Sequence, residues 1–202
     1  MHRPMALLVQ LFTSLMFFMA AGMCYAQPVD GEGPWEGDGP PPHVLVPVRS
    51  EENGLVGFTS GSGRSLAPVY EEAGWFEAGV APVKLNGKWG LIDTLGRTVT
   101  EMKYDLLSNS TNGIALGYTS DGAQVCILRM KEPEVCVAWE AYWAAWKQEL
   151  EATVLADKVL ILRVLEMHRD PASRLKEMTH LQQTYQEVIQ VRDRAVDRVL
   201  RK

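Results

Sequence analysis

The sequence has few of the residue types on which most enzyme and metal sites depend. Its 202 residues include only 3 cysteines and 4 histidines. There is no Cys-x-x-Cys pair, no cluster of Cys and His at zinc-ligand spacing, and no Gly-x-Ser-x-Gly nucleophile motif. The Gly-rich run 59–64 lacks the Lys-Ser/Thr of a phosphate-binding loop. We therefore expect no catalytic residue, no metal site and no cofactor, although the 25 acidic residues leave a carboxylate-based glycosidase open.

Positive charge and long hydrophobic runs are also scarce. The net charge is −5, so the surface as a whole does not attract nucleic acid. After the first 26 residues, no apolar run is long and uncharged enough to cross a membrane. The stretch from Val159 to Leu165 is short and contains Arg163. The sequence thus predicts neither nucleic-acid binding nor an internal membrane span.

Residues 1–26 predict a signal peptide. A basic start at Arg3 precedes an uncharged stretch over residues 6–23. Small residues then lead to an expected cleavage bond between Ala26 and Gln27. The alternatives are an uncleaved membrane anchor or a lipoprotein acylated at Cys24, whose preceding residue fits that signal poorly. We expect an exported protein, periplasmic or extracellular, with membrane attachment only in those two cases.

Composition divides the rest of the chain into three parts. Residues 27–43 are acidic and rich in proline and glycine, which predicts an extended linker. Residues 44–137 hold short apolar runs separated by turn dipeptides, which predicts a β domain. Residues 138–202 contain no glycine and a single proline, Pro171, which predicts helices. The expected fold class is α+β, a small antiparallel meander followed by an antiparallel two-helix hairpin.

Two cysteines remain after signal cleavage. Cys126 and Cys136 lie in apolar runs on either side of a short polar segment, as in a β-hairpin that brings the sulfurs together. An even pair in an oxidising compartment predicts a structural disulfide, with a stabilisation of ~2–3 kcal/mol for so short a loop. The alternative is a redox-active pair, which normally has the Cys-x-x-Cys spacing that is absent here.

The β-rich part contains a repeated pattern. The segment from Asn86 to Asp93 (NGKWGLID) has weaker copies on both sides, at spacings of roughly 33–35 residues. Asn-Gly and Asp-Gly pairs provide the positive φ angles of tight hairpins. Many such turns in succession favour an antiparallel meander over parallel strands linked by helices.

Residues 54–128 resemble the WG repeat, a β-hairpin module common in bacteria. The resemblance is carried by the segments 79–83, 86–93, 95–99 and 103–105, with degraded copies before and after them. It implies a β-fold and no particular activity. Within the motif, Trp89 is expected to be a buried core anchor, with an exposed ligand platform as the alternative. Gly90 is expected to allow a bulge or a close backbone approach beside the indole ring.

The C-terminal part shows helical periodicity on both sides of Asp170-Pro171. Asp is a good N-cap and Pro fits the first helical position, so a second helix is expected to begin there. Each helix would be about 30 residues and roughly 45 Å long. An antiparallel hairpin is favoured over one long helix kinked at Pro171 and paired with another chain. Basic residues near the C-terminus, including Arg192, Arg194 and Arg198, are expected to complement the helix dipole.

The first of these helices is apolar on more than one side. Leu155, Val159 and Leu162 fall outside its main stripe of tryptophans and aliphatic residues. The second apolar side must meet the β domain, a second copy of the chain or another protein. We therefore expect protein–protein contact or homo-oligomerisation through the C-terminal helices.

Together these features predict an exported, non-enzymatic interaction protein of the bacterial cell envelope. The alternative is a protein that binds or hydrolyses cell-wall glycans, suggested by the acidic β surface and by Trp35, Trp75 and Trp89. A membrane-tethered scaffold follows if the signal segment is retained.

Overall fold

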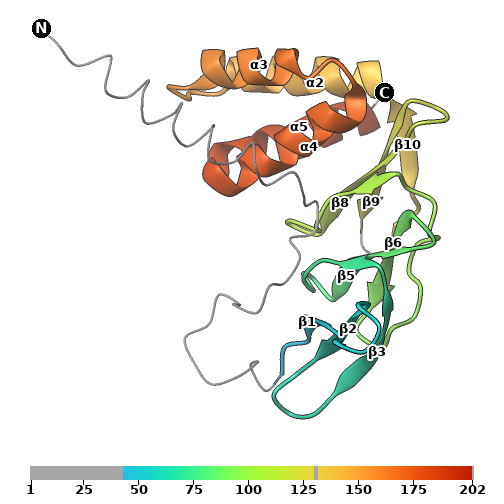
Figure 1. Cartoon of the computed structure of the whole chain (residues 1–202). Coiled ribbons are helices and arrows are strands. Elements are labelled where there is room, and N and C mark those ends of the chain that lie inside the picture. The colour runs from blue at the N-terminus through green and yellow to red at the C-terminus, as the bar shows by residue number, and fades with distance from the viewer. Residues whose placement is uncertain (1–42, 130–131, 202) are drawn as a thin grey trace, which may run out of the picture.

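The computed structural model describes residues 43–129 and 132–201. The predicted signal segment, Cys24, the Ala26–Gln27 bond and residues 27–42 of the expected linker lie outside this part of the chain. The described part consists of antiparallel sheets followed by helices, which confirms the α+β class (Figure 1).

Short strands form three sheets in chain order. The first sheet contains β1 (Val46–Arg49), β2 (Val56–Thr59) and β3 (Ser65–Tyr70), the second β4 (Glu72–Ala73), β5 (Val80–Leu85) and β6 (Lys88–Asp93), and the third β7 (Leu106–Leu107), β8 (Ile114–Thr119), β9 (Gln124–Arg129) and β10 (Val135–Ala138). All neighbouring strands are antiparallel, so the predicted meander is confirmed. The sheets follow one another along the long axis, and the third lies next to the helices (Figure 1).

The turn dipeptides place the hairpins as the sequence predicts. Asn86 and Gly87 have φ angles of 53° and 75° and form the two-residue turn between paired Leu85 and Lys88. Residues 97–100 form no named strand, but they make a bridge to Ile92 and backbone hydrogen bonds with Leu91 and Asp93 of β6. β3 was not predicted, and its bulged pairing with β2 explains the weak alternation of its sequence.

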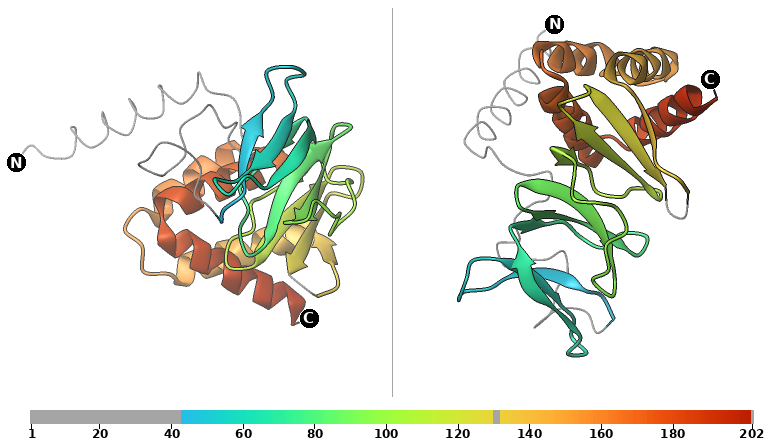
Figure 2. Two further views of the ribbon diagram at one scale, coloured as in Figure 1. Left: turned by 90° about the horizontal axis from the view of Figure 1, so that it is seen from below. Right: turned by 90° about the vertical axis from the view of Figure 1, so that its right-hand side faces the viewer.

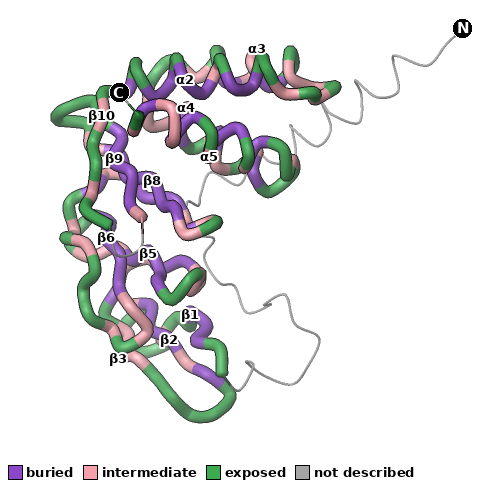
Figure 3. Tube along the Cα trace, turned by 180° about the vertical axis from the view of Figure 1, so that it is seen from behind, coloured by how far each residue is buried: buried purple, intermediate pink, exposed green. Residues whose placement is uncertain are grey.

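Buried side chains point to both faces of the second and third sheets. In β5, Ala81 and Val83 pack with the first sheet, whereas Val80 packs with the third. In β8, Ala115 packs in the core between the second and third sheets, whereas Leu116 faces the helices. We call the core between these two sheets the middle core; its buried members are Val80, Trp89, Leu91, Tyr104, Leu107, Ala115, Cys126 and Leu128. Buried positions therefore continue along the stack from sheet to sheet (Figure 3). Burial on both faces explains why these strands read as nearly continuous apolar runs.

An acidic residue of each repeat closes the turn of the next hairpin. The carboxylate of Glu71 accepts hydrogen bonds of 3.1 and 3.2 Å from the backbone N–H of Gly87. One repeat later, Asp105 accepts bonds from the backbone N–H and the hydroxyl of Ser120, at 2.7 and 2.8 Å. Asp105 also pairs with Lys88 of the preceding hairpin. Each acid thus fixes the spacing between consecutive hairpins.

Replacing Asp105 by asparagine is expected to destabilise the protein more at pH 7 than at pH 2. Lys88 and Ser120 lower the pKa of Asp105 from 3.8 to about 2. A carboxyl whose pKa is lower in the folded state stabilises above its unfolded pKa, and that stabilisation is lost as pH falls through the folded pKa. Urea unfolding at pH 7, 4 and 2 measures this. Equal penalties at pH 7 and pH 2 would contradict the assignment.

The C-terminal part forms a helical hairpin whose two arms are each broken once. The helices are α2 (Trp139–Ala152), α3 (Lys158–Met167), α4 (Pro171–Thr184) and α5 (Gln186–Leu200). α2 packs against α5 and α3 against α4, so the predicted antiparallel arrangement is correct (Figure 1). As expected, α4 begins at Pro171, and the Asp170 carboxylate accepts a 2.9 Å bond from the N–H of Ser173. The breaks after α2 and at Tyr185 were not predicted.

The helices cover the face of the third sheet that the second sheet leaves free (Figure 2). Trp139, Trp143 and Trp146 of α2 are buried in one core with side chains of β8 and β9. The rings of Trp139 and Trp143 stack at 6.3 Å, and those of Trp143 and Trp146 at 5.7 Å. The main tryptophan stripe therefore packs against both the third sheet and the other helices. Over the described residues, no helix combines the length and apolarity needed to span a bilayer.

Candidate binding cavity between the repeats

A cavity of about 540 Å³ lies between the second and third sheets. Its apolar wall is formed by side chains from both sheets and the segment that follows β6: Val80, Leu91, Val99, Ala115 and Leu128. Charged residues from the end of β9 and from the segments after β6 and β9 also line it: Glu101, Lys103, Arg129, Glu132 and Glu134. An apolar wall with a few polar groups is the usual construction of a ligand site.

The glycine of the WG dipeptide determines the shape of one side of this cavity. Trp89 is 4% exposed and packs in the middle core, so its indole does not form an exposed platform. A Cβ on Gly90 would lie 2.8 Å from the carbonyl oxygen of Thr100 and 2.9 Å from that of Glu101. Absence of a side chain at Gly90 therefore allows the segment containing Thr100 and Glu101 to cross directly over the strand. Gly57 of the preceding hairpin is crowded in the same way, with Leu66 O 2.6 Å from the added Cβ.

Acidic groups outnumber basic ones in the cavity, and both basic groups are already engaged. Lys103 Nζ lies 2.8 Å from a carboxylate oxygen of Glu134. Arg129 lies 2.6 Å from Asp197 of α5 and 3.8 Å from Glu132. Within the part of the chain that the structure describes, Glu101 has no ion-pair partner. The free charge that the cavity offers a ligand is therefore negative.

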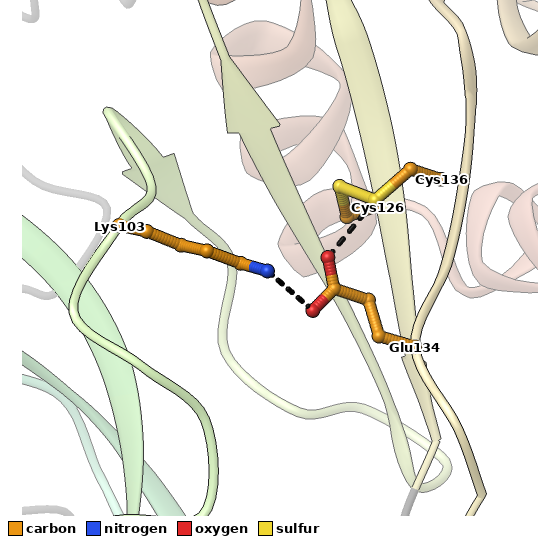
Figure 4. The surroundings of a disulfide bond; sticks show 4 residues. All are labelled: Lys103, Cys126, Glu134 and Cys136. Atoms are coloured by element: carbon orange, nitrogen blue, oxygen red, sulfur yellow. Dashed lines mark hydrogen bonds and ion pairs between the residues drawn. A yellow bond between two sulfur atoms is a disulfide. The ribbon is translucent and has the colours of Figure 1, made fainter.

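A disulfide lies next to Glu134, a residue of the cavity lining (Figure 4). Cys126 of β9 and Cys136 of β10 face each other in register, with their sulfurs 2.08 Å apart. Cys126 is buried in the middle core, whereas Cys136 is exposed. One carboxylate oxygen of Glu134 lies 2.9 Å from Sγ of Cys136, and the other faces Lys103. The hairpin that the sequence predicts thus carries a crosslink beside an ion pair.

The expected interaction residues on the helices differ in exposure. Leu155 and Leu162 are half-buried against the main core, which is the core that the helices form with β8 and β9. Val159 is 60% exposed. Further exposed apolar side chains occur on the same arm: Val154, Leu160 and Met167. The second apolar side of the first helical arm is therefore partly core and partly open surface.

The C-terminal arginines have structural partners that helix-dipole reasoning missed. Arg192 is 1% exposed and donates to the carbonyl of Thr111 at 2.8 Å and to Gln182 at 3.3 Å. Arg194 and Arg198 both bind the buried carboxylate of Glu149 in α2, and these arginines lower its pKa. One signal was present in the sequence, because Arg192 occupies a position of the apolar stripe of α5.

Among the described residues, Glu77 and Tyr104 have raised pKa values but do not line the cavity. Burial raises the pKa of Glu77, but its neighbours are the Asn112 backbone and Arg192 rather than the cavity. Burial also raises the pKa of Tyr104, and Glu134 adds to that shift. No histidine lines the cavity described above. The sulfurs of Cys126 and Cys136, joined as a disulfide, are not available as thiolates.

The comparison with known families agrees with this geometry. A family model described as WG containing repeat matches residues 65–89 and 89–116. The chain contains WG repeats. The first matched WG repeat runs from β3 to Trp89, and the second from Trp89 into β8. The lining residues from Val80 to Ala115 thus lie within the matched WG repeats. The lining residues from Leu128 to Glu134, and the helices, lie outside the matched segments. No curated protein and no solved structure matches the chain.

Proposed function

We propose that this protein is an exported, non-enzymatic binding protein of the bacterial cell envelope, which holds a basic segment of a protein partner in the cavity between its WG repeats. The observation that carries this proposal is the acidic, apolar-walled cavity of about 540 Å³. Export rests on the signal-like N-terminal sequence.

The chemistry of the cavity favours a lysine or arginine side chain. Such a side chain has an aliphatic stem and a charged end, and it can lay the stem on apolar surface while the charge meets an acid. Val80, Leu91 and Leu128 provide the apolar surface, and Glu101 provides the carboxylate. An anionic ligand would meet Glu101, Glu132 and Glu134 without a free cation in the described lining.

The open apolar surface on α3 supports the same kind of function. Val159, Leu160 and Met167 are 60%, 42% and 78% exposed. Exposed apolar side chains that cluster are typical of protein contact. A second copy of the chain is the alternative occupant of this surface.

Glycan binding has less support from the aromatic residues. Trp89 is buried, and Trp75 is only partly exposed. Trp35 lies outside the described residues. A glycan platform needs open aromatic faces, and at Trp89 the ring is covered by the middle core.

A short peptide with one lysine between two leucines is expected to bind the cavity, whereas the same peptide with glutamate is not. Glu101→Gln should lower the affinity for the lysine peptide by up to about fivefold, because one partly exposed ion pair contributes ~0.2–1 kcal/mol. The measurement is an NMR titration that follows the amides of Leu91, Ala115 and Leu128.

The matched control is Glu140→Gln, which removes an exposed acid on α2, away from the cavity. It should leave the affinity unchanged. Equal binding of the lysine and glutamate peptides, or shifts confined to residues outside the cavity, would refute the proposed site.

A further inference from the structure

The disulfide and its neighbouring carboxylate form a compact set of potential metal ligands. Sγ of Cys126, Sγ of Cys136 and a carboxylate oxygen of Glu134 all lie within 4.8 Å of one another. The grouping follows from strand geometry. Cys126 and Cys136 are cross-strand partners, and Glu134 precedes Cys136 by two positions, so its side chain is on the same side. Figure 4 shows the carboxylate pointing at the sulfurs.

We propose that reduction of the Cys126–Cys136 disulfide creates a zinc site with these two thiolates and the Glu134 carboxylate as protein ligands. The fourth ligand is water, for which the adjoining cavity provides space. This inference does not depend on the proposed peptide binding or on export.

The reaction balances with a dithiol as the reductant. The dithiol gives two electrons and two protons to the Cys126–Cys136 bond and itself becomes a disulfide. Zn²⁺ then binds both sulfurs and displaces their two protons to solvent. Tetrahedral zinc holds its two sulfurs roughly 3.8 Å apart, given Zn–S bonds of ~2.3 Å. Reduction frees the sulfurs to separate to that distance, whereas the disulfide prevents it.

Lys103 already orients the carboxylate for this role. It binds one oxygen of Glu134 at 2.8 Å, and the other oxygen lies 2.9 Å from Sγ of Cys136. Glu134 can therefore ligate zinc through one oxygen while it keeps the ion pair through the other. Partners that orient a metal-binding carboxylate in this way raise metal affinity. The ammonium also offsets the net negative charge of two thiolates and one carboxylate around Zn²⁺.

Zinc fits this ligand set better than the hard cations do. Two thiolates and one carboxylate form a mixed sulfur and oxygen set of low coordination number, which Zn²⁺ accepts. Calcium and magnesium prefer six or more oxygen ligands, and the group offers only one carboxylate.

The test compares the full chain in its oxidised and reduced forms. The protein is reduced with dithiothreitol, desalted in oxygen-free buffer, equilibrated with Zn²⁺ and desalted again, and bound zinc is measured by elemental analysis. We expect about one zinc per reduced chain and almost none per oxidised chain. Cys136→Ser should abolish zinc uptake, and Glu134→Gln should raise the Kd for zinc at least about tenfold. Glu140→Gln, on exposed α2 surface, should have no effect.

Two further measurements distinguish zinc binding in a folded site from zinc binding by two thiols of an unfolded chain. Co²⁺ in place of Zn²⁺ should give a thiolate charge-transfer band in the reduced protein only. Circular dichroism of the reduced, metal-free chain reports whether the fold is kept. Equal zinc uptake by oxidised and reduced protein would overturn the proposal. So would equal affinity of wild type and Glu134→Gln, because the carboxylate would then not be a ligand.

Discussion

Replacing Arg192 by alanine is expected to lower the free energy of unfolding by about 3–5 kcal/mol, because the substitution breaks a buried charged network. The guanidinium joins three parts of the molecule, through Gln182 of α4, Asp193 of α5 and the carbonyl of Thr111 before β8. Alanine leaves these groups without their donor and also leaves a cavity. Urea unfolding at pH 7, followed by circular dichroism, measures the loss.

Two other variants serve as controls for the Arg192→Ala measurement. Arg201→Ala removes an exposed arginine at the end of α5 and should change stability by less than about 0.5 kcal/mol. Arg192→Met refills much of the volume without the donors, so its penalty should lie between the other two. A loss below about 1 kcal/mol for Arg192→Ala would show that the network does not hold the helices to the sheet.

Gly90→Ala is expected to destabilise the protein by about 2–3 kcal/mol, because the new methyl group would overlap backbone. The added Cβ would lie 2.6 Å from the sulfur of Met102 and 2.8 Å from the carbonyl oxygen of Thr100. The Met102 side chain can rotate away, but the crossing segment must shift as a whole. Thermal or urea unfolding measures the change. Since Thr100 and Glu101 line the cavity, the variant should also weaken binding of the lysine peptide.

Gly122→Ala is the matched control for this substitution. Its Cβ would lie 3.3 Å or more from its nearest neighbours, all atoms of the flexible Gln124 side chain. We expect a change within about 0.5 kcal/mol. If Gly90→Ala were as stable as Gly122→Ala, the close crossing beside Trp89 would not be a requirement of the repeat.

Local signals in the sequence are sufficient to predict the β-hairpins and the start of α4. Asn86-Gly87 and Asn112-Gly113 have the positive φ angles that their chemistry favours. Asp170-Pro171 starts a helix because both residues act on backbone groups of the first turn. These features depend on neighbours within a few residues. That is why they can be derived from a single sequence.

Features that depend on distant parts of the chain could not be predicted. The cavity exists only because the segment after β6 lies opposite the segment after β9, and no local pattern specifies that pairing. The side chain of Arg192 looked like a solvated helix-terminal charge, yet the turn at Thr111 supplies a buried acceptor for it. Leu155 and Leu162 looked equivalent to Val159, but packing on the main core covers only the first two.

The closure of each hairpin turn by an earlier acid has a consequence for the order in which the molecule is made. Glu71 leaves the ribosome before Gly87, and Asp105 before Ser120. Each acid is therefore already present when the turn to which it hydrogen-bonds emerges. Domains fold as they are synthesised, N-terminal parts first. The face of β8 and β9 that carries Leu116 and Ile127 is the exception, because the helices that cover it follow it in the chain. A nascent chain therefore carries that apolar face uncovered until α2 and the later helices have emerged, which makes the docking of these helices the step that protects it from aggregation.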